Sequence, residues 1–199
     1  MEVGDLSLQT LFKSLQGVIM LKLIGSFFAG VVAVAIIGWN MMGGMMFNER
    51  VSPFGLEETV ARIQQNIEGT GKGWALAGLR FPAKAVQADG GNALPVIMVE
   101  ACSTKYSGPI LNEDSVKFLS ILMPCKISIY KKNDGKVYIG TMNAALMGPM
   151  FGPLVGGIMK QVAEDQQKFL VMDPSKPTPQ IIYPKAAGGG ATGGGGSGC

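Results

Sequence analysis

A run of 25 residues without an ionisable side chain, from Leu23 to Phe47, constrains this chain more than any other feature. As an α-helix it would be about 37 Å long, against about 30 Å for the hydrocarbon core of a bilayer. Backbone N–H and C=O groups in lipid must be satisfied within their own segment, which favours a helix. The sequence therefore predicts one transmembrane helix over residues 23–47.

A cleavable signal peptide is the alternative interpretation of this run. Ala33-Val34-Ala35 has the small-x-small form of a cleavage site. However, the apolar run continues for about twelve residues past that site, further than a signal peptide needs. We therefore favour an uncleaved signal-anchor.

Small residues recur four positions apart along this helix, which lets a second helix approach closely. One row consists of Gly25, Ala29 and Ala33, and a second of Ser26 and Gly30. We expect these rows to pack against integral membrane subunits of a larger complex. Chance is the alternative, because small residues are frequent in membrane helices.

The basic residues that flank the helix predict its orientation. Lys13 and Lys22 precede it and Arg50 follows it, so the positive-inside rule places the N-terminus in the cytoplasm. This would make the chain a single-pass protein of a bacterial inner membrane with a periplasmic domain. Residues 1–22 would be cytoplasmic, and within them 6–20 have amphipathic spacing that fits either an interfacial helix or an extension of the membrane helix.

Methionine and aromatic residues are concentrated where the helix ends and again in a later apolar bridge, MGPMFGPLVGG. Methionine is a flexible apolar side chain suited to adaptable contacts, and tryptophan is a frequent interfacial anchor. We expect an interface made by Trp39, Met41, Met42, Met45, Met46, Met147, Met150 and Phe151.

Residues 50–170 have the pattern of one small α+β domain. Leu56, Val60, Ile63 and Ile67 recur at helical spacing, and Asn133-Asp134-Gly135 is a strong hairpin signal. The expected strands are 74–81, 94–102, 125–130 and 136–142. The first expected helix is 56–71. It is followed by a short helix or loop at 82–92, a short helix near 114–119 and a last helix at 154–170.

Four short motifs in this region resemble the domain-of-unknown-function 302 family over about residues 50–170. The motifs are Ser52-Pro53, Glu58-Thr59-Val60, Ala101-Cys102 and Leu122-Met123-Pro124-Cys125. The resemblance implies a β-α-β4-α unit with helices on one face of an antiparallel sheet, and it implies no settled activity. The apolar helix, the bridge and the tail look like departures from the plain family domain and suggest recruitment to an assembly.

Cys102 ends one expected strand and Cys125 begins the next. If the two strands pair antiparallel, both sulfurs lie at one end of the sheet, where a disulfide is feasible. Three interpretations stay open at this point: a disulfide or close contact, two buried unpaired thiols, or a redox or metal site.

The tail, residues 171–199, begins with four prolines and ends in a glycine-rich stretch. Prolines favour an extended segment, and glycine-rich sequence is disordered on its own. A partner surface is one explanation for such a tail, and a linker-like ending is the other.

The chain contains no histidine, which removes Ser-His and Cys-His nucleophile pairs and histidine metal sites. Glu100, Glu113 and Asp114 are the only carboxylates that could line a cleft, so we expect no enzyme. A net charge of +3 without a basic cluster also argues against nucleic-acid binding.

The leading hypothesis is therefore a non-catalytic, single-span accessory subunit of a membrane complex, with the bilayer and integral subunits as partners and without a cofactor. Respiratory and photosynthetic electron-transfer complexes are the candidate hosts. The alternative is a membrane-tethered module that binds a ligand or a soft metal such as Cu(I). Its ligands would be Met142, Met147, Met150 and Met159 with Cys102 or Cys125.

Overall fold

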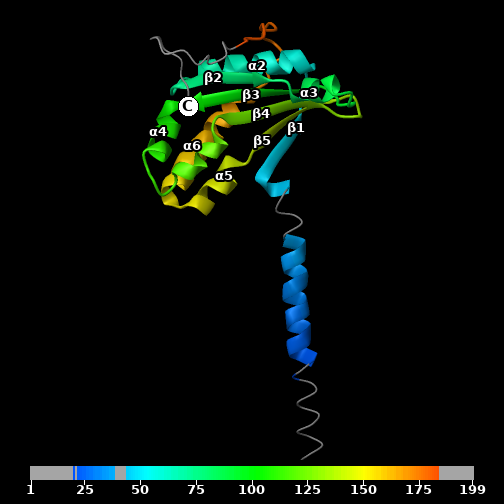
Figure 1. The fold of residues 1–199 in the computed structure, drawn as a ribbon, viewed down its shortest axis with the longest axis vertical. Coiled ribbons are helices and arrows are strands. Elements are labelled where there is room, and N and C mark those ends of the chain that lie inside the picture. Colours follow the sequence, from blue (N-terminus) through cyan, green and yellow to red (C-terminus); the bar gives the residue numbers. More distant parts are fainter. Residues whose placement is uncertain (1–19, 21, 39–43, 184–199) are drawn as a thin grey trace, which may run out of the picture. The chain divides into compact units, whose positions relative to one another are not determined.

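The computed structural model describes residue 20 and residues 22–38 and 44–183. The chain divides into two compact units, Met1–Gly44 and Met45–Cys199, which we describe separately. In the first unit residues 22–38 are helical, and the second unit is an α+β domain (Figure 1). Within the described ranges, no helix combines the length and the apolar character needed to cross a bilayer.

The domain is built on one antiparallel sheet of five strands in the order β1-β5-β4-β3-β2. The predicted α+β class with an antiparallel sheet is thus confirmed. The strands are β1 (Phe47–Val51), β2 (Trp74–Arg80), β3 (Val96–Ser103), β4 (Cys125–Lys131) and β5 (Val137–Met142).

The two long helices, α2 (Leu56–Thr70) and α6 (Pro153–Phe169), cover one face of this sheet. Side chains alternate across a strand, so Val99, Ile127 and Ile139 all point to that face, where they are fully buried. The shorter helices are α3 (Pro82–Ala88), α4 (Thr104–Leu111), α5 (Ala144–Met147) and the 3-10 turns η1 (Lys117–Leu122) and η2 (Gly148–Phe151).

The other face of the sheet carries polar and aromatic side chains. Tyr130 and Tyr138 stack across β4 and β5 with ring centroids 6.1 Å apart, and Lys132 lies over the Tyr138 ring. Glu49 on β1 binds Lys132 at 2.6 Å and accepts a hydrogen bond from Tyr130. Polar residues on one face and aliphatic residues on the other are typical of an antiparallel sheet with helices on one side.

The predicted helix over 23–47 is wrong at its C-terminal end. Phe47 begins β1, which pairs with β5 so that Phe47 lies opposite Met142 and Val51 opposite Tyr138. The segment FNERV alternates apolar and polar side chains, so it suits an edge strand better than the end of an apolar helix. Residues 39–43 lie outside the described residues.

The connection between β3 and β4 also differs from its prediction. One short helix was expected near 114–119, whereas the chain forms α4 directly after β3 and then η1. Pro109 lies inside α4. Because proline usually argues against a helix interior, the sequence did not predict this helix. The other expected elements agree with the structure to within three residues at most of their ends, and the hairpin turn carries Gly135 at a φ of 79°.

Candidate functional site

Every described side chain along the apolar helix at 22–38 is exposed. Phe27 and Val34, for example, are 68% and 71% exposed. A Cβ atom added at Gly25 or Gly30 would meet nothing within 4 Å, so the small-residue rows, which also include Ser26, Ala29 and Ala33, are open to a neighbouring helix. The prediction that another helix packs there stays a prediction.

The chain enters the domain beside α5. Asn143 holds the entering segment, because its side-chain amide donates to the Met45 carbonyl at 3.0 Å and its backbone N–H donates to the Met46 carbonyl at 2.8 Å. Several large apolar side chains near this point are exposed. We call this surface the apolar end; it consists of Met45, Phe118, Ile121, Leu146, Met150 and Leu154.

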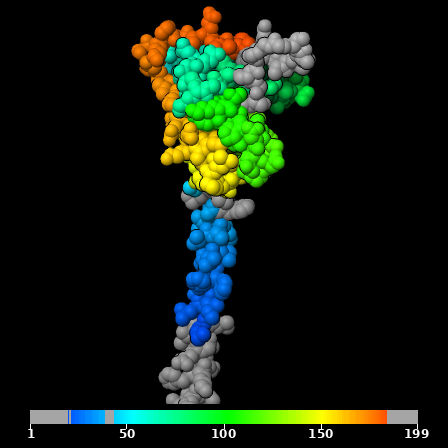
Figure 2. Space-filling view, turned by 90° about the vertical axis from the view of Figure 1, so that its left-hand side faces the viewer, coloured from blue at the N-terminus to red at the C-terminus, as the bar shows by residue number. Residues whose placement is uncertain are grey.

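The space-filling view shows α4 and η1 in green and α5, η2 and the start of α6 in yellow, side by side at this end of the domain (Figure 2). Of the predicted interface, Met45 and Met150 belong to the apolar end, and Met46 is half-buried. Met147 is buried and Phe151 half-buried, so both face inward instead. Trp39, Met41 and Met42 lie outside the described residues.

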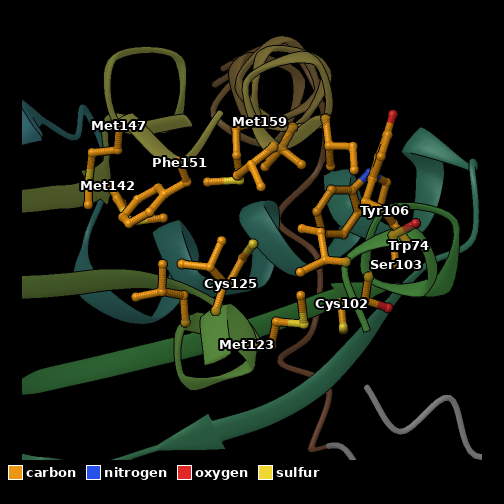
Figure 3. A pocket seen from close by; sticks show the side chains of 17 residues that line it. Trp74, Cys102, Ser103, Tyr106, Met123, Cys125, Met142, Met147, Phe151 and Met159 are labelled. Carbon is orange, nitrogen blue, oxygen red and sulfur yellow. The ribbon is translucent and has the colours of Figure 1, made fainter. Parts of the chain in front are cut away.

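Behind the apolar end lies a cavity of about 50 Å³ inside the domain. It is lined by one end of the sheet, α4, η1, the α5–η2 segment and α6 (Figure 3). Its apolar and aromatic lining includes Trp74, Tyr106, Ile110, Leu119, Leu122, Phe151, Val155, Ile158 and Val162, and its two serines are Ser103 and Ser107.

Sulfur-containing residues make up the rest of the lining. They are Cys102, Met123, Cys125, Met142, Met147 and Met159. The structure thus brings together three of the four methionines that the sequence suggested as soft ligands, together with both cysteines. It excludes Met150, which is 67% exposed at the apolar end, and it adds Met123.

Cys102 and Cys125 do not form a disulfide with each other, because Cys125 has a free thiol. The register explains this outcome. Cys125 pairs with Ala101, and Cys102 is the next residue along β3, so strand alternation turns the two cysteine side chains away from each other, although both border the cavity at this end of the sheet. Burial raises the pKa of the Cys125 thiol, which keeps it protonated at neutral pH.

A charged cluster that sequence reasoning missed lies next to the cavity. Asp165 on α6 is fully buried, and it accepts hydrogen bonds from Tyr106 at 2.7 Å and from the Trp74 indole at 3.1 Å. It also forms ion pairs with Lys168 at 2.7 Å and Lys72 at 3.1 Å. We call these five residues the Asp165 cluster.

The electrostatics of the cluster follow from these bonds. Burial by itself would raise the pKa of Asp165, but the hydrogen bonds from Lys168, Trp74, Tyr106 and Lys72 outweigh it and hold the pKa well below its usual value. For Tyr106, burial and the hydrogen bond to Asp165 both act in the same direction and raise the pKa to about 12. Asp165 is therefore an ionised structural anchor rather than a proton donor.

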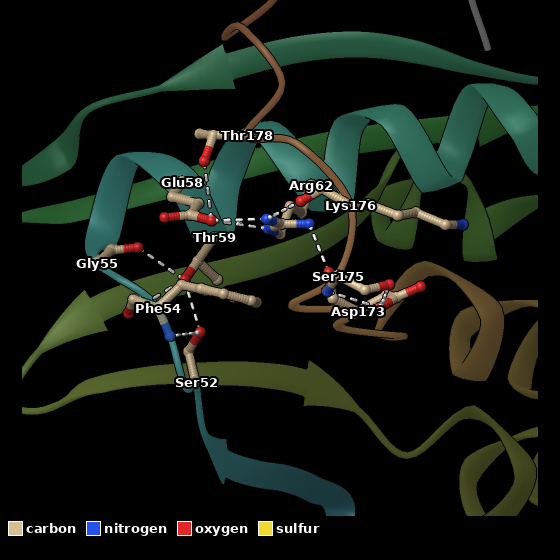
Figure 4. Close-up of polar contacts among 10 residues, drawn as sticks. All are labelled: Ser52, Phe54, Gly55, Glu58, Thr59, Arg62, Asp173, Ser175, Lys176 and Thr178. Carbon is tan, nitrogen blue, oxygen red and sulfur yellow. Dashed lines mark hydrogen bonds and ion pairs between the residues drawn. The ribbon is translucent and has the colours of Figure 1, made fainter.

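The C-terminal segment, residues 171–183, lies along α2 of its own domain (Figure 4). Arg62 donates to the carbonyls of Asp173 at 2.8 Å and Lys176 at 2.9 Å, and it is held in place by Glu58 at 2.7 Å. The buried Gln64 side chain makes two hydrogen bonds to the backbone of Ile182. The described part of the tail thus packs against α2 of its own chain.

The family-like motifs at the start of the domain have a structural role. Ser52 and Thr59 share a buried hydrogen bond of 2.6 Å, and Thr59 also donates to the Gly55 carbonyl at the start of α2 (Figure 4). These contacts fix the turn from β1 into α2, from which Glu58 and Arg62 reach the C-terminal segment.

The carboxylates considered for catalysis do not share a cleft. Glu100 lies on the outer face of the sheet and pairs with Arg80 at 3.2 Å. Gly78 makes room for it, because a Cβ there would come within 2.3 Å of Glu100 Oε2. Glu113 and Asp114 are exposed in the turn after α4 and bind Ser115 and Lys117.

Comparison with known proteins gives one family and one solved structure to report. The family described as "Domain of unknown function DUF302" matches residues 48–171. The crystal structure of an uncharacterized conserved protein DUF302 from Bacillus stearothermophilus is similar with a TM-score of 0.56 and 22% sequence identity, over 63% of this chain and 96% of that one. No curated protein matches. The match over residues 48–171, more than half of the chain, shows that this protein belongs to the DUF302 family.

Proposed function

We propose that this chain is a non-catalytic accessory subunit of a membrane complex, anchored by its apolar helix and docked through the apolar end of its DUF302 domain. The observation that carries the proposal is the helix at 22–38, where Lys22 is the only ionisable residue and every described side chain is exposed. Ten large apolar side chains between Met20 and Ile37 are more than 45% exposed. Exposed apolar surface on this scale indicates burial by lipid or by another protein.

The apolar end supports a contact with a partner for a separate reason. Met45 is the first residue of the domain unit and belongs to the apolar end. Ile121 is 81% exposed and Phe118 is 62% exposed, and aromatic and methionine side chains of this kind are enriched at protein interfaces.

Membrane fractionation tests the anchor. In the double variant Phe27→Glu/Val31→Glu, two charges interrupt the apolar helix, and we expect the chain to leave the membrane fraction because charges are costly in hydrocarbon. Val86→Glu/Val171→Glu is the matched control, since both residues are exposed apolar positions on the domain outside the apolar end. Wild-type protein that is recovered in the soluble fraction as a monomer would refute the proposal.

A pull-down in mild detergent, read by mass spectrometry, tests the docking role. We expect wild type to recover integral membrane subunits in constant proportion, which would also show whether the host is an electron-transfer complex. Ile121→Glu/Met150→Glu should remain in the membrane but recover those subunits at a level at least about tenfold lower, because a buried unpaired charge weakens an interface strongly. Equal recovery by both proteins would argue against docking through the apolar end.

The proposed orientation places residues 1–22 in the cytoplasm and the domain in the periplasm of a bacterial inner membrane. It rests on Lys13 and Lys22 before the helix against Arg50 after it. Protease added to spheroplasts should digest the domain and spare an N-terminal tag. The opposite pattern would reverse the orientation without affecting the proposed accessory role.

A further inference from the structure

The cavity behind the apolar end is suited to an occupant other than water. Its volume of about 50 Å³ exceeds the roughly 10–15 Å³ that one water molecule needs. Water in a protein interior also needs two to four polar partners, and the lining here is almost entirely apolar. A small occupant that sulfur can bind therefore fits this site.

The chemistry of the lining selects among ions. Thioether and thiol sulfur atoms are soft ligands that prefer Cu(I), whereas Mg²⁺, Ca²⁺ and Mn²⁺ prefer oxygen. No carboxylate lines the cavity, and in the described ranges no three histidine, cysteine or acidic side chains lie close enough together to hold a metal. Five residues that line the cavity besides Cys102 carry sulfur, and they come from four separate segments of the domain.

Two of these sulfur-bearing side chains face each other. Met159 extends from α6 and Cys125 from the first position of β4, and Figure 3 shows them pointing toward one another across the cavity, with Met123 pointing into the same space. Both are held on regular secondary structure. Cys125 is paired in the sheet with Ala101, and Met159 is fixed against Gly148, where an added Cβ would lie only 2.5 Å from the Met159 Cβ.

Charge balance favours a monovalent ion. A cation bound in an apolar site is costly unless an opposite charge accompanies it. When Cys125 binds the ion, its thiol loses one proton to solvent, and the resulting thiolate neutralises a single positive charge. We propose that this cavity is a binding site for one soft monovalent cation of the Cu(I) class, ligated by the Cys125 thiolate and the Met159 and Met123 thioethers.

The test uses the full chain in detergent with Cu(I) supplied anaerobically as its bicinchoninate complex. Cys102→Ala/Cys199→Ser is the background, so that Cys125 is the only cysteine. We expect this protein to retain one Cu(I) per chain after desalting, with an X-ray absorption spectrum that reports only sulfur ligands. Ag(I), which binds soft ligands and does not change oxidation state, should compete for the same site.

Cys125→Ser and Met159→Leu should each weaken Cu(I) binding at least about tenfold, since each removes a soft ligand. Met150→Leu removes a methionine that is exposed outside the cavity, and it should bind like the background protein. Leucine conserves the volume of methionine, so circular dichroism and a urea titration can confirm that the variants are folded.

Failure of the background protein to retain Cu(I), or binding that survives both Cys125→Ser and Met159→Leu, would overturn the proposal. Equal losses in Met150→Leu would overturn it as well, because they would indicate nonspecific binding to surface methionines. The site does not depend on the accessory role, so a chain that fails the pull-down can still bind Cu(I), and the reverse also holds.

Discussion

Trp74 and Tyr106 join two regions of the domain with opposite character. Their polar atoms both bind Asp165, whereas their rings line the cavity. In the Asp165 cluster every buried polar group has a partner, and among the described residues no buried side-chain nitrogen or oxygen lacks a hydrogen bond. In the cavity, by contrast, the protein leaves space unfilled.

The difference suggests how the cavity persists. Protein interiors are normally packed without voids much larger than a water molecule, so neighbouring side chains tend to collapse into empty space. Trp74 and Tyr106 cannot move into the cavity without breaking their bonds to a buried, ionised carboxylate. The Trp74 ring is also packed edge-on against Phe169 at 5.0 Å. The charged cluster therefore keeps two walls of the cavity in place.

The largest expected effect comes from disrupting the Asp165 cluster. Asp165→Ala would leave the Trp74 indole N–H and the Tyr106 hydroxyl buried without an acceptor. We expect a loss of about 3 to 5 kcal/mol in the free energy of unfolding, as for other buried ionic networks that lose one member. Urea unfolding of the full chain, followed by tryptophan fluorescence, measures this loss. Glu164→Ala changes the exposed neighbouring residue and is the control, which should alter the free energy of unfolding by less than about 0.5 kcal/mol. If Asp165→Ala lowered the free energy of unfolding by less than about 1 kcal/mol, the Asp165 cluster would not be a structural anchor.

The sequence predicted the apolar framework of this domain and missed the cluster that fixes it. Strand alternation and helical spacing are local patterns, so β2 to β5, α2 and α6 could be recognised from the side chains that they bury. Asp165 lies 59 residues from Tyr106 and 91 from Trp74, and no local pattern marks an aspartate that will be buried by such distant partners. Three of the predicted soft ligands converged because Met142, Met147 and Met159 belong to elements that meet at one end of the sheet. Met150 did not, since a 3-10 turn points it outward.

A second, smaller effect concerns the wall of the cavity where η2 meets α6. A Cβ at Gly148 would lie 2.5 Å from the Met159 Cβ and 3.3 Å from the Gly156 Cα. We expect Gly148→Ala to cost about 1 to 3 kcal/mol of unfolding free energy, the usual range for forcing extra volume into a packed contact. At Gly157 on α6 an added Cβ meets nothing within 4 Å, so Gly157→Ala should leave stability unchanged or raise it by up to about 1 kcal/mol. Equal urea midpoints for the two variants would contradict this assignment.

A third pair of variants compares filled and unfilled regions of the core directly. Val60 on α2 is fully buried among close-packed residues, whereas Val155 lines the cavity. Val60→Ile should cost about 1 to 2 kcal/mol through overpacking. Val155→Ile adds the same methylene next to empty space, and we expect a change between zero and a gain of about 0.8 kcal/mol. Equal losses measured by urea unfolding would mean that the cavity wall is as tightly packed as the rest of the core.

The smallest expected effect is a decline in stability at alkaline pH that arises from the Asp165 cluster and not from the cavity. The pKa of Tyr106 is raised to about 12, from an unfolded value near 10. A raised pKa contributes stability below the unfolded pKa and loses it as pH rises through the folded value, so this contribution should decline between about pH 10 and pH 12. Tyr106→Phe cannot ionise at this position, and its urea midpoint should therefore fall less steeply than that of wild type across this window. Asp165 acts in the opposite direction, because its lowered pKa contributes stability above about pH 4 and loses it only in stronger acid. Parallel alkaline slopes for wild type and Tyr106→Phe would show that the Tyr106 hydroxyl is not held against an ionised Asp165, and the account of how the cavity wall is fixed would fail with it.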